Sequence, residues 1–328
     1  MTEFTPPSSE QLAEASNLVG RISSELSKAI IGQDSVIEQV LVGLFAAGHV
    51  LLEGVPGLGK TLLVKALAKT FDGSFSRIQF TPDLMPSDIT GHAMFEQQSG
   101  EFRIRRGPVF SNLLLADEIN RAPAKTQAAL LEVMQERQVT IEGTEMELSP
   151  PFMTLATQNP IELEGTYPLP EAQLDRFLLK ILIDYPDSDA EVSLVRAVTS
   201  GHVGDVLDVS EVVKVIDPQE VTSIQTLVSN LLVDEKVNDY AVSIVRCTRE
   251  WPGVAVGAGP RGGIALVRAA RARAFMLSRD FVTPDDIKAV AAPCLRHRLV
   301  LSPELEIEGR SGDEILMGIL ERVDAPRT

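Results

Sequence analysis

Hydrophobic residues recur at helical spacing in the first part of the chain. Between residues 10 and 29 the apolar positions lie three or four residues apart, which predicts an amphipathic helix. A second predicted helix covers residues 34–47 and begins at Asp34, a residue type that often caps helix N-termini. Residues 1–9 are rich in Ser, Pro and Thr, and we expect this N-terminal segment to be disordered.

Short apolar runs follow, and further helical patterns separate them. Continuous apolar runs are typical of parallel strands that are buried on both faces of a sheet. The predicted strands are residues 49–52, 76–80, 112–116, 152–157 and 177–183, with helices at 61–70 and 124–136. Strands that alternate with helices predict an α/β fold with a doubly wound, parallel, five-stranded sheet.

Two segments between these elements have the pattern of hairpins. In residues 95–110, Ser99 and Gly100 indicate a turn, after which Phe102 and Ile104 alternate with Arg103 and Arg105. Residues 138–148 turn near Gly143. Residues 81–91 contain two prolines and are expected to form a loop.

The pattern becomes helical after Asp184. Helices are predicted at 187–200, 217–232, 234–249, 261–278 and 284–292, and residues 201–215 are expected to be a loop with room for a short strand. A length of 328 residues suits two domains. We therefore expect an α/β domain at residues 10–184 and an α-helical lid domain at residues 185–328.

Composition narrows the classes of function. The net charge of −16 argues against non-specific nucleic-acid binding, which needs clustered Lys and Arg. Cys247 and Cys294 have no metal-binding or redox spacing, and none of the four histidines forms a metal-ligand or catalytic-triad pattern. The N-terminus has no basic-then-apolar signal segment, and the longest apolar stretch, residues 40–50, is too short to span a bilayer. We expect a cytoplasmic protein without membrane insertion.

The segment after the first predicted strand carries the strongest chemical signal. Gly54, Gly59, Lys60 and Thr61 fit the G-x-x-x-x-G-K-[ST] phosphate loop, between a strand and a helix as that motif requires. Glycines let backbone N–H groups approach a polyphosphate, and the helix N-terminus attracts its negative charge. Lys60 is expected to reach the β and γ phosphates of ATP, and the Thr61 hydroxyl to bind Mg²⁺. The alternative is a chance loop of small residues.

Two carboxylates follow the third predicted strand. Asp117 and Glu118 come directly after Leu-Leu-Leu-Ala, the arrangement called Walker B. In open α/β sheets ligands bind beyond the carboxyl ends of the strands. Asp117 is expected to hold Mg²⁺ through water, and Glu118 to polarise the attacking water. The alternative is an acidic pair that caps a strand.

Asn159 ends the next predicted strand and could orient the same water, unless it is only a turn residue before Pro160. Arg176 could stabilise charge during phosphoryl transfer. Its alternative is a surface salt bridge with Asp175 or Glu171, and sequence alone does not say whether it serves its own site or a neighbour's.

Arg261 is predicted to begin a lid helix after Pro260, where it could contact phosphate; the alternative is an exposed arginine. Arg121 is a weaker candidate for a contact between subunits.

The chain resembles the MoxR family of AAA+ ATPases over residues 10–325. The resemblance rests on the order of six segments: I-I-G-Q at 30–33, G-V-P-G-L-G-K-T at 54–61, R-I-Q-F-T-P-D-L-M-P-S-D-I-T-G at 77–91, A-D-E-I-N-R-A at 116–122, A-T-Q-N-P at 156–160 and L-P-E-A-Q-L-D-R-F at 169–177. One departure is visible, because Gly259 stands where the lid motif often has Ser before Pro-Arg.

The resemblance implies roles for individual residues. Asn159 would be the first sensor, Arg176 the arginine finger acting on the adjacent subunit, and Arg261 the second sensor. The ATP contacts would be Ile31, Gly32, Gly54, Val55, Pro56, Gly57, Leu58, Gly59, Lys60, Thr61 and Leu62, with Mg²⁺ at Thr61 and Asp117. The turn at residues 30–33 would lie beside the adenine. The two hairpins would be the helix-2 insert and the hairpin before the first sensor. The family implies a homo-oligomeric ring, typically a hexamer, chaperone-like activity on protein complexes, and partners with von Willebrand factor A domains.

Three functions follow from these patterns. The first is an ATP-driven remodeller of protein complexes. The second is a DNA-associated motor; Glu142, Glu145 and Glu147 in one hairpin argue against it, whereas Arg103, Arg105 and Arg106 in the other keep it open. The third is a nucleotide-locked scaffold with little turnover, against which Glu118 argues, because a binding-only protein has no need of that base.

Overall fold

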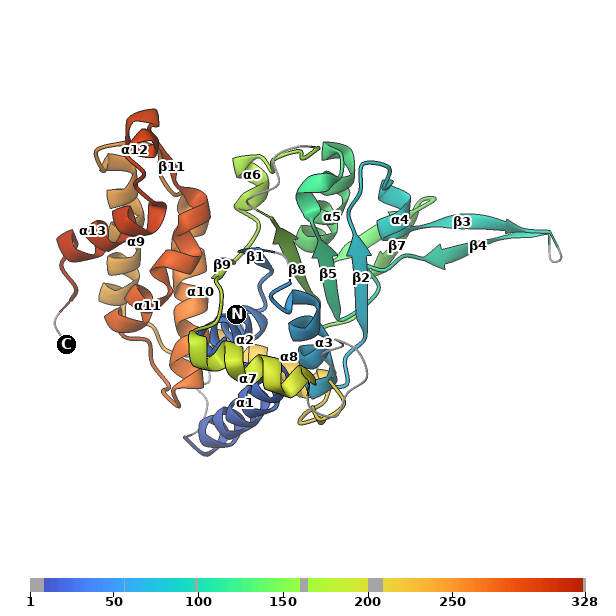
Figure 1. The fold of residues 1–328 in the computed structure, drawn as a ribbon, viewed down its shortest axis with the longest axis horizontal. Coiled ribbons are helices and arrows are strands. Elements are labelled where there is room, and N and C mark those ends of the chain that lie inside the picture. Colours follow the sequence, from blue (N-terminus) through green and yellow to red (C-terminus); the bar gives the residue numbers. More distant parts are fainter. Residues whose placement is uncertain (1–8, 56, 98–99, 160–164, 200–208, 327–328) are drawn as a thin grey trace.

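A computed structural model describes residues 9–55, 57–97, 100–159, 165–199 and 209–326 (Figure 1). The expectation of disorder at residues 1–9 is wrong at Ser9, which begins helix α1, and residues 1–8 lie outside these ranges. An α/β layer forms one side of the molecule and helices α9–α13 form the other (Figure 1). None of the helices in the described ranges is both long and apolar enough to cross a bilayer.

The central sheet is parallel and five-stranded, as the alternating pattern predicts. Its strand order is β2-β5-β8-β1-β9. The strands are β1 (Val50–Gly54), β2 (Phe75–Gln79), β5 (Leu113–Asp117), β8 (Met153–Gln158) and β9 (Leu179–Ile183). All four neighbouring pairs run parallel, so the carboxyl ends of the five strands lie along one edge of the sheet.

Helices cover both faces of the sheet because side chains of a strand alternate between its faces. Val50 and Leu52 of β1 are buried in one core with the helices α1 (Ser9–Ala29), α2 (Asp34–Phe45) and α3 (Lys60–Thr70). Leu51 is buried in the core on the opposite face, with α5 (Ala124–Glu136). The layers are therefore helix, sheet and helix.

The two hairpins are present, and their turns are correctly predicted at Gly100 and Gly143; Ser99 lies outside the described residues. The first hairpin is wrong in its boundaries: β3 (Gly91–Glu96) pairs with β4 (Glu101–Arg106), so the hairpin begins four residues earlier than expected. The second consists of β6 (Gln138–Ile141) and β7 (Thr144–Glu147). The β3–β4 hairpin projects from the body of the molecule (Figure 1).

The expectation of a loop throughout residues 81–91 is also wrong, because residues 86–90 form a short helix, α4 (Pro86–Thr90). Pro86 occupies the first turn, and the Asp88 carboxylate accepts a hydrogen bond from the Met85 N–H at 2.8 Å. Proline and a capping carboxylate both stabilise a helix start.

The part of the chain after Asp184 is largely helical, as predicted. Its helices are α7 (Ser188–Thr199), α8 (Pro218–Ser229), α9 (Glu235–Glu250), α10 (Pro260–Met276), α11 (Pro284–Leu295), α12 (Pro303–Ile307) and α13 (Gly312–Arg322). The sequence patterns did not predict α12, α13 or the small ladder of β10 (Val254–Val256) and β11 (Val300–Leu301). Residues 209–215 form no helix or strand, while 201–208 lie outside the described ranges.

The helices after Asp184 pack against α1 and α2, which cover one face of the sheet. Phe275 of α10 meets Phe45 of α2 edge to face, with ring centroids 6.1 Å apart. Arg268 of α10 donates to the carbonyls of Ala46 and Ala47, just after α2. One apolar core runs from α1 and α2 into α8, α10 and α11. The domain boundary at residues 184 and 185 stays a prediction.

His49 joins three elements at the start of β1. Its Nε2–H donates to the Met134 carbonyl at 2.9 Å, and its Nδ1 accepts from the Thr154 N–H at 2.9 Å. Burial lowers the pKa of His49 from 6.5 to about 4. A proton on Nδ1 would remove the acceptor that Thr154 uses.

This pair of bonds predicts an acid-sensitive fold. In the unfolded chain His49 takes up a proton near pH 6.5, whereas in the folded chain it does so only near pH 4. The contribution of neutral His49 to the free energy of unfolding is therefore complete above pH 6.5 and is lost as the pH falls towards 4. We expect urea unfolding between these pH values to show a shallower pH slope in His49→Gln than in wild type, by up to about 1.4 kcal/mol per pH unit. Parallel slopes for the two proteins would contradict this assignment.

Candidate active site

The predicted phosphate loop joins β1 to α3 at the carboxyl edge of the sheet. Gly57 and Gly59 have φ angles of +89° and +74°, in the region that glycine adopts most readily. An added Cβ at Gly54 would lie 2.4 Å from the Ile183 carbonyl oxygen of β9, so only glycine fits there. Pro56 lies outside the described residues. The loop thus has the backbone conformation and close strand contact that its glycines predict.

Lys60 and Thr61 open helix α3. The Lys60 ammonium donates to the Gly54 carbonyl at 2.5 Å, which folds the side chain back across the loop. Burial lowers the pKa of Lys60, and the negative charges of Asp117, Glu118 and Glu53 oppose that shift. Lys60 therefore lies within electrostatic reach of both predicted carboxylates.

Asp117 and Glu118 lie at the carboxyl end of β5 and share one hydroxyl. The Thr157 hydroxyl of β8 donates to Asp117 Oδ1 at 2.7 Å and accepts from the Glu118 N–H at 2.8 Å. Glu118 has a φ of +55°, an uncommon conformation for a residue other than glycine. Thr157 thus holds the Asp117 carboxylate and the backbone of Glu118 at the sheet edge.

Strand β2 supplies further partners to the same carboxylates. Arg77 pairs with Asp117 Oδ2 at 2.6 Å, and the Gln79 amide donates to Glu118 Oε2 at 2.7 Å. Arg121 also donates to Glu118 Oε2, at 3.0 Å. Arg121, the weaker candidate for a contact between subunits, therefore contacts the carboxylate of its own site.

The residues present fit a magnesium ion. Mg²⁺ prefers hard oxygen ligands and keeps several waters, so it needs few protein donors. The Thr61 hydroxyl and the Asp117 carboxylate are such donors. In this structure the Arg77 guanidinium supplies the positive charge beside Asp117.

Asn159 and the Ile31–Gly32 turn complete the carboxyl edge. Asn159 directly follows β8 and is buried. Ile31 and Gly32 lie between α1 and α2, and the next residue, Gln33, donates to the Leu58 carbonyl of the phosphate loop at 3.4 Å. The structure therefore places Asn159 and the predicted adenine contacts on the same side of the sheet as the phosphate loop.

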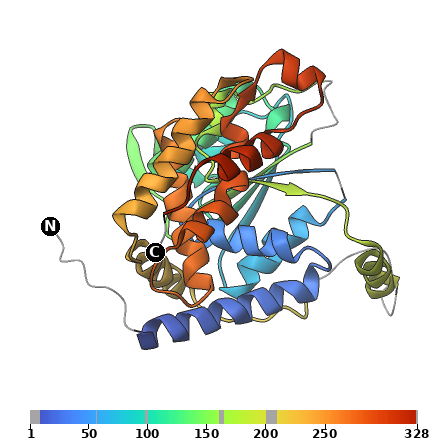
Figure 2. The same ribbon diagram turned by 90° about the vertical axis from the view of Figure 1, so that its left-hand side faces the viewer.

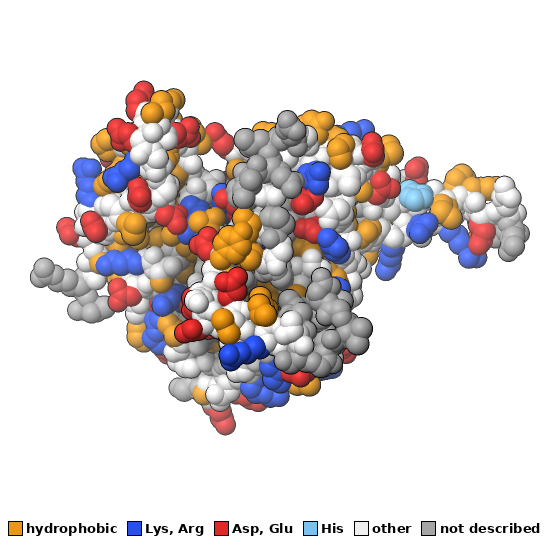
Figure 3. Space-filling model, viewed as in Figure 1, with side chains coloured by type: hydrophobic (Ala, Val, Ile, Leu, Met, Phe, Trp, Pro, Cys, Tyr) orange, Lys and Arg blue, Asp and Glu red, His pale blue; other side chains and the backbone are white. Residues whose placement is uncertain are grey.

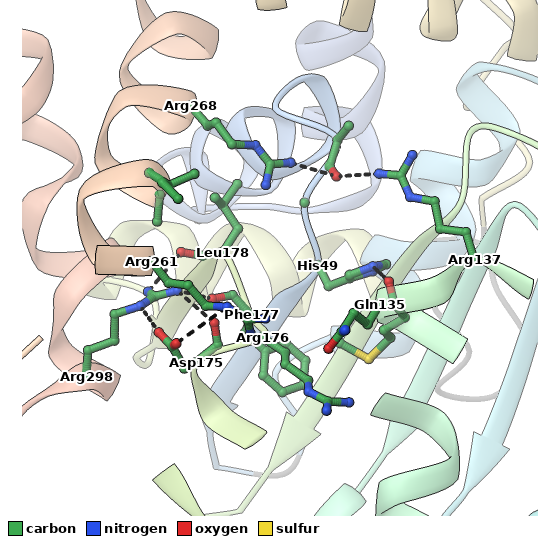
Figure 4. Close-up of a pocket in the computed structure, with 15 residues that line it drawn as sticks. His49, Gln135, Arg137, Asp175, Arg176, Phe177, Leu178, Arg261, Arg268 and Arg298 are labelled. Carbon is green, nitrogen blue, oxygen red and sulfur yellow. Dashed lines mark hydrogen bonds and ion pairs between the residues drawn. The ribbon is translucent and has the colours of Figure 1, made fainter. Parts of the chain in front are cut away.

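Arg176 and Arg261 lie at the opposite edge of the sheet. Arg176 comes two residues before Leu178, whose N–H bonds to the carbonyl of His49 at the start of β1. Arg261, in the first turn of α10, lines the same cavity of about 300 Å³ as Arg176 (Figure 4). Both arginines are thus gathered at the amino edge, and neither lies beside its own phosphate loop.

Asp175 organises this amino-edge cavity. Arg298, which is almost fully buried, donates to Asp175 Oδ1 at 2.7 Å, and Arg261 lies 3.9 Å from Oδ2. Figure 4 shows the Arg176 guanidinium directed away from this pair. Within the described part of the chain Arg176 forms no side-chain hydrogen bond or ion pair, so the alternative of a salt bridge with Asp175 or Glu171 is not formed.

Sequence patterns did not single out Arg77, Gln79, Thr157 or Arg298. A signal exists for the first two, because they alternate on a strand and so project from the same face. Arg298 contacts Asp175 across 123 residues, and no periodicity connects the two positions.

Comparisons with known proteins agree with this geometry. A sequence model of the ATPase family associated with various cellular activities (AAA) matches residues 49–179, and one of the AAA lid domain matches residues 246–319. The Chaperone MoxR1 of Mycobacterium tuberculosis is 43% identical over 99% of this chain and 87% of its own length. The Protein MoxR of Methylorubrum extorquens is 33% identical, over 98% of each chain. A crystal structure of a proposed ATPase from Cytophaga hutchinsonii has a TM-score of 0.89 and 44% identity, and covers 97% of this chain and 98% of its own.

Proposed function

Since this chain belongs to the MoxR family of AAA+ ATPases, we propose that it hydrolyses ATP at boundaries between copies of itself in a ring and uses that cycle to remodel partner protein complexes. The family membership rests on relatives that match nearly the whole chain. The proposal goes beyond family membership, because it places ATP hydrolysis at the boundary between two copies of the chain.

One observation carries this proposal, namely the separation of the two charged sites. The phosphate loop lies at the carboxyl edge, and Arg176 and Arg261 lie at the amino edge. Strands β1 and β9 are paired over five residues, Val50–Gly54 with Leu179–Ile183. At about 3.3 Å per residue, the two edges are about 16 Å apart. An arginine side chain does not bridge that distance, so Arg176 serves the nucleotide of another copy.

The chain's own residues divide the work of hydrolysis between them. The backbone of residues 54–61 wraps the phosphates, and Lys60 turns from the Gly54 carbonyl to the β and γ oxygens. Glu118 polarises the attacking water, with Asn159 orienting it. Arg176 and Arg261 of the neighbouring copy stabilise charge on the γ-phosphate. Thr61 and Asp117 would hold Mg²⁺, which would supply positive charge against the phosphates.

The remodelling step is supported by the relatives and by surface charge. One relative is named a chaperone. Glu142, Glu145 and Glu147 of the β6–β7 hairpin are all exposed, and acidic side chains repel nucleic-acid phosphate. On the other hairpin Arg103 is paired with Glu96 at 2.9 Å. The exposed glutamates of one hairpin and the ion-paired Arg103 of the other favour a protein client over DNA.

The wider assignment extends to assembly and location. We propose a hexameric ring, a partner with a von Willebrand factor A domain, and a cytoplasmic location, on the strength of the family resemblance. The client complex is a protein assembly whose contacts with the ring differ between its ATP-bound and ADP-bound states.

The proposal is tested by measuring phosphate release against protein concentration, with particle mass measured on the same samples. Shared sites predict that specific activity rises as oligomers form, because a lone copy lacks the arginines of a neighbour. The rise in specific activity and the rise in particle mass should have the same midpoint protein concentration. Full specific activity in a sample that contains only monomers would contradict the proposal.

A further inference from the structure

Helix α7 lies on the surface with little of its side-chain area covered. Within its described side chains, Val192 and Val195 are 46% and 55% exposed, and Tyr185 just before the helix is 73% exposed. Asp187, Asp189 and Glu191 surround its first turn. Figure 3 shows apolar and acidic side chains intermixed on this face of the molecule. The helix thus presents an apolar stripe with an acidic start.

This exposed helix is attached to the nucleotide side of the molecule. A Cβ added to Gly32 would lie 2.3 Å from Ala190 Cβ of α7 and 3.3 Å from Pro186 Cβ. Gly32 belongs to the turn assigned to adenine, so α7 packs directly against that turn.

A groove between α9 and α10 has the complementary chemistry. It encloses about 530 Å³, and its walls include Ala241, Val242, Val245, Ile264 and Val267. Val242 and Ile264 are 52% and 58% exposed. The groove is also lined by Arg246, Arg249, Arg268 and Arg271. An apolar floor with a basic rim suits a helix that is apolar on one face and acidic at one end.

Two of the rim arginines, Arg271 and Arg246, have no ion-pair partner within the described chain. The Nε of Arg271 is buried without a hydrogen-bond partner there. Arg246 is exposed and forms no ion pair with any described residue. Because a buried N–H without an acceptor is costly, an acidic group in the groove would stabilise the folded protein.

The groove continues into the amino-edge cavity. Ile264 and Arg268 line both the groove and the cavity that holds Arg176 and Arg261. If those two arginines reach the nucleotide of a second copy, the groove beside them faces the surroundings of that nucleotide. Helix α7 is part of those surroundings.

The positions of the two surfaces suit a head-to-tail contact. Figure 2 shows α7 on one side of the molecule and α9 on the opposite side. A contact that joins different surfaces of identical chains repeats from copy to copy and closes into a ring when the rotation permits.

We propose that α7 of one copy docks into the α9–α10 groove of the next copy, with its valines on the apolar floor and its carboxylates towards the arginine rim. The inference rests on the proposed function, because it names the contact that brings Arg176 and Arg261 to a neighbour's nucleotide. It makes α7 an element that couples the adenine turn of one subunit to the lid of another.

Cross-linking between two differently tagged forms of the chain tests this docking. One form carries Val195→Cys and the other Val242→Cys, both with Cys247→Ser. Cys294 is fully buried, and burial raises the pKa of its thiol to about 12, so it does not compete. The mixed forms are treated with a short bismaleimide in Mg-ATP, and mass and ATPase activity are measured on the same samples. A form with Ser193→Cys in place of Val195→Cys is the matched control.

Docking predicts a cross-linked heterodimer for Val195→Cys, and much less for the control. It also predicts that Val195→Asp raises the protein concentration for half-assembly about tenfold or more, whereas Ser193→Asp does not. On the groove side, Arg246→Glu should weaken assembly and Lys236→Glu, an equal charge change on α9 outside the groove, should not.

Oligomers with concentration-dependent activity but no heterodimer, and with Val195→Asp assembling normally, would overturn the docking and leave the proposed function intact. Monomers with full activity would overturn the proposed function, and the docking with it.

Discussion

Replacing Arg176 with alanine is expected to lower the ATPase rate by about 10³-fold to 10⁵-fold, the range that arginine fingers contribute to phosphoryl transfer. The Arg176 guanidinium has no ion pair in the described chain and is directed away from Asp175, so it is available to a neighbour's γ-phosphate (Figure 4). Steady-state phosphate release at saturating ATP measures the effect. ATP affinity should change little, because the phosphate loop is at the other edge of the sheet.

Two further arginine variants provide a comparison for the ATPase rate of Arg176→Ala. Arg261→Ala should cause a smaller loss, about 10-fold to 100-fold, since it removes one charge-assisted hydrogen bond. Arg310 is an exposed lid arginine whose nearest carboxylate is Glu314 at 3.4 Å, and Arg310→Ala should retain wild-type activity. Equal activity in Arg176→Ala and Arg310→Ala would reduce Arg176 to a surface residue.

Replacing Glu118 with glutamine is expected to lower the rate by about 10²-fold to 10⁴-fold, the usual contribution of a general base. Glutamine keeps the size of the side chain and one acceptor oxygen, so the contacts with Gln79 and Arg121 can persist while the carboxylate is lost. Single-turnover hydrolysis measures the chemical step, and a fluorescent ATP analogue measures binding, which should be retained.

The alternative role for Glu118 predicts a different result. If the acidic pair only caps β5, Glu118→Gln should alter the unfolding free energy and leave the rate per folded molecule near that of wild type. A variant that hydrolyses ATP normally would also remove the reason for preferring an ATPase to a nucleotide-locked scaffold.

The carboxyl edge of the sheet could be predicted from sequence because its signals are local. Gly54, Lys60 and Thr61 lie within eight consecutive positions, and Asp117 directly follows an apolar strand. The parallel sheet then brings such strand ends together without further information. Which residues hold the carboxylates could not be predicted in this way. Arg77 meets Asp117 across 40 residues, and that pairing depends on β2 lying next to β5.

The amino edge was less accessible to sequence reasoning. The family resemblance names Arg176 and Arg261, but their common cavity depends on the packing of α10 against α2. The missed helix α13 did leave a signal, because Ile315, Leu316 and Ile319 are buried at helical spacing. The start of the β3–β4 hairpin left no such signal. Apolar and basic residues alternate along β4 but not along β3, so the pattern does not show that Gly91 begins the hairpin by pairing with Arg106.

The most direct test of hydrolysis at shared boundaries is to mix Arg176→Ala protein with Glu118→Gln protein. Each variant alone is expected to be nearly inactive. In mixed rings, some boundaries join the intact Glu118 site of an Arg176→Ala copy to the intact Arg176 of a Glu118→Gln copy. The account predicts that the mixture regains up to about a quarter of wild-type ATPase activity, the share of such boundaries in random mixing. A mixture no more active than its parents, in rings shown by mass to contain both variants, would contradict it.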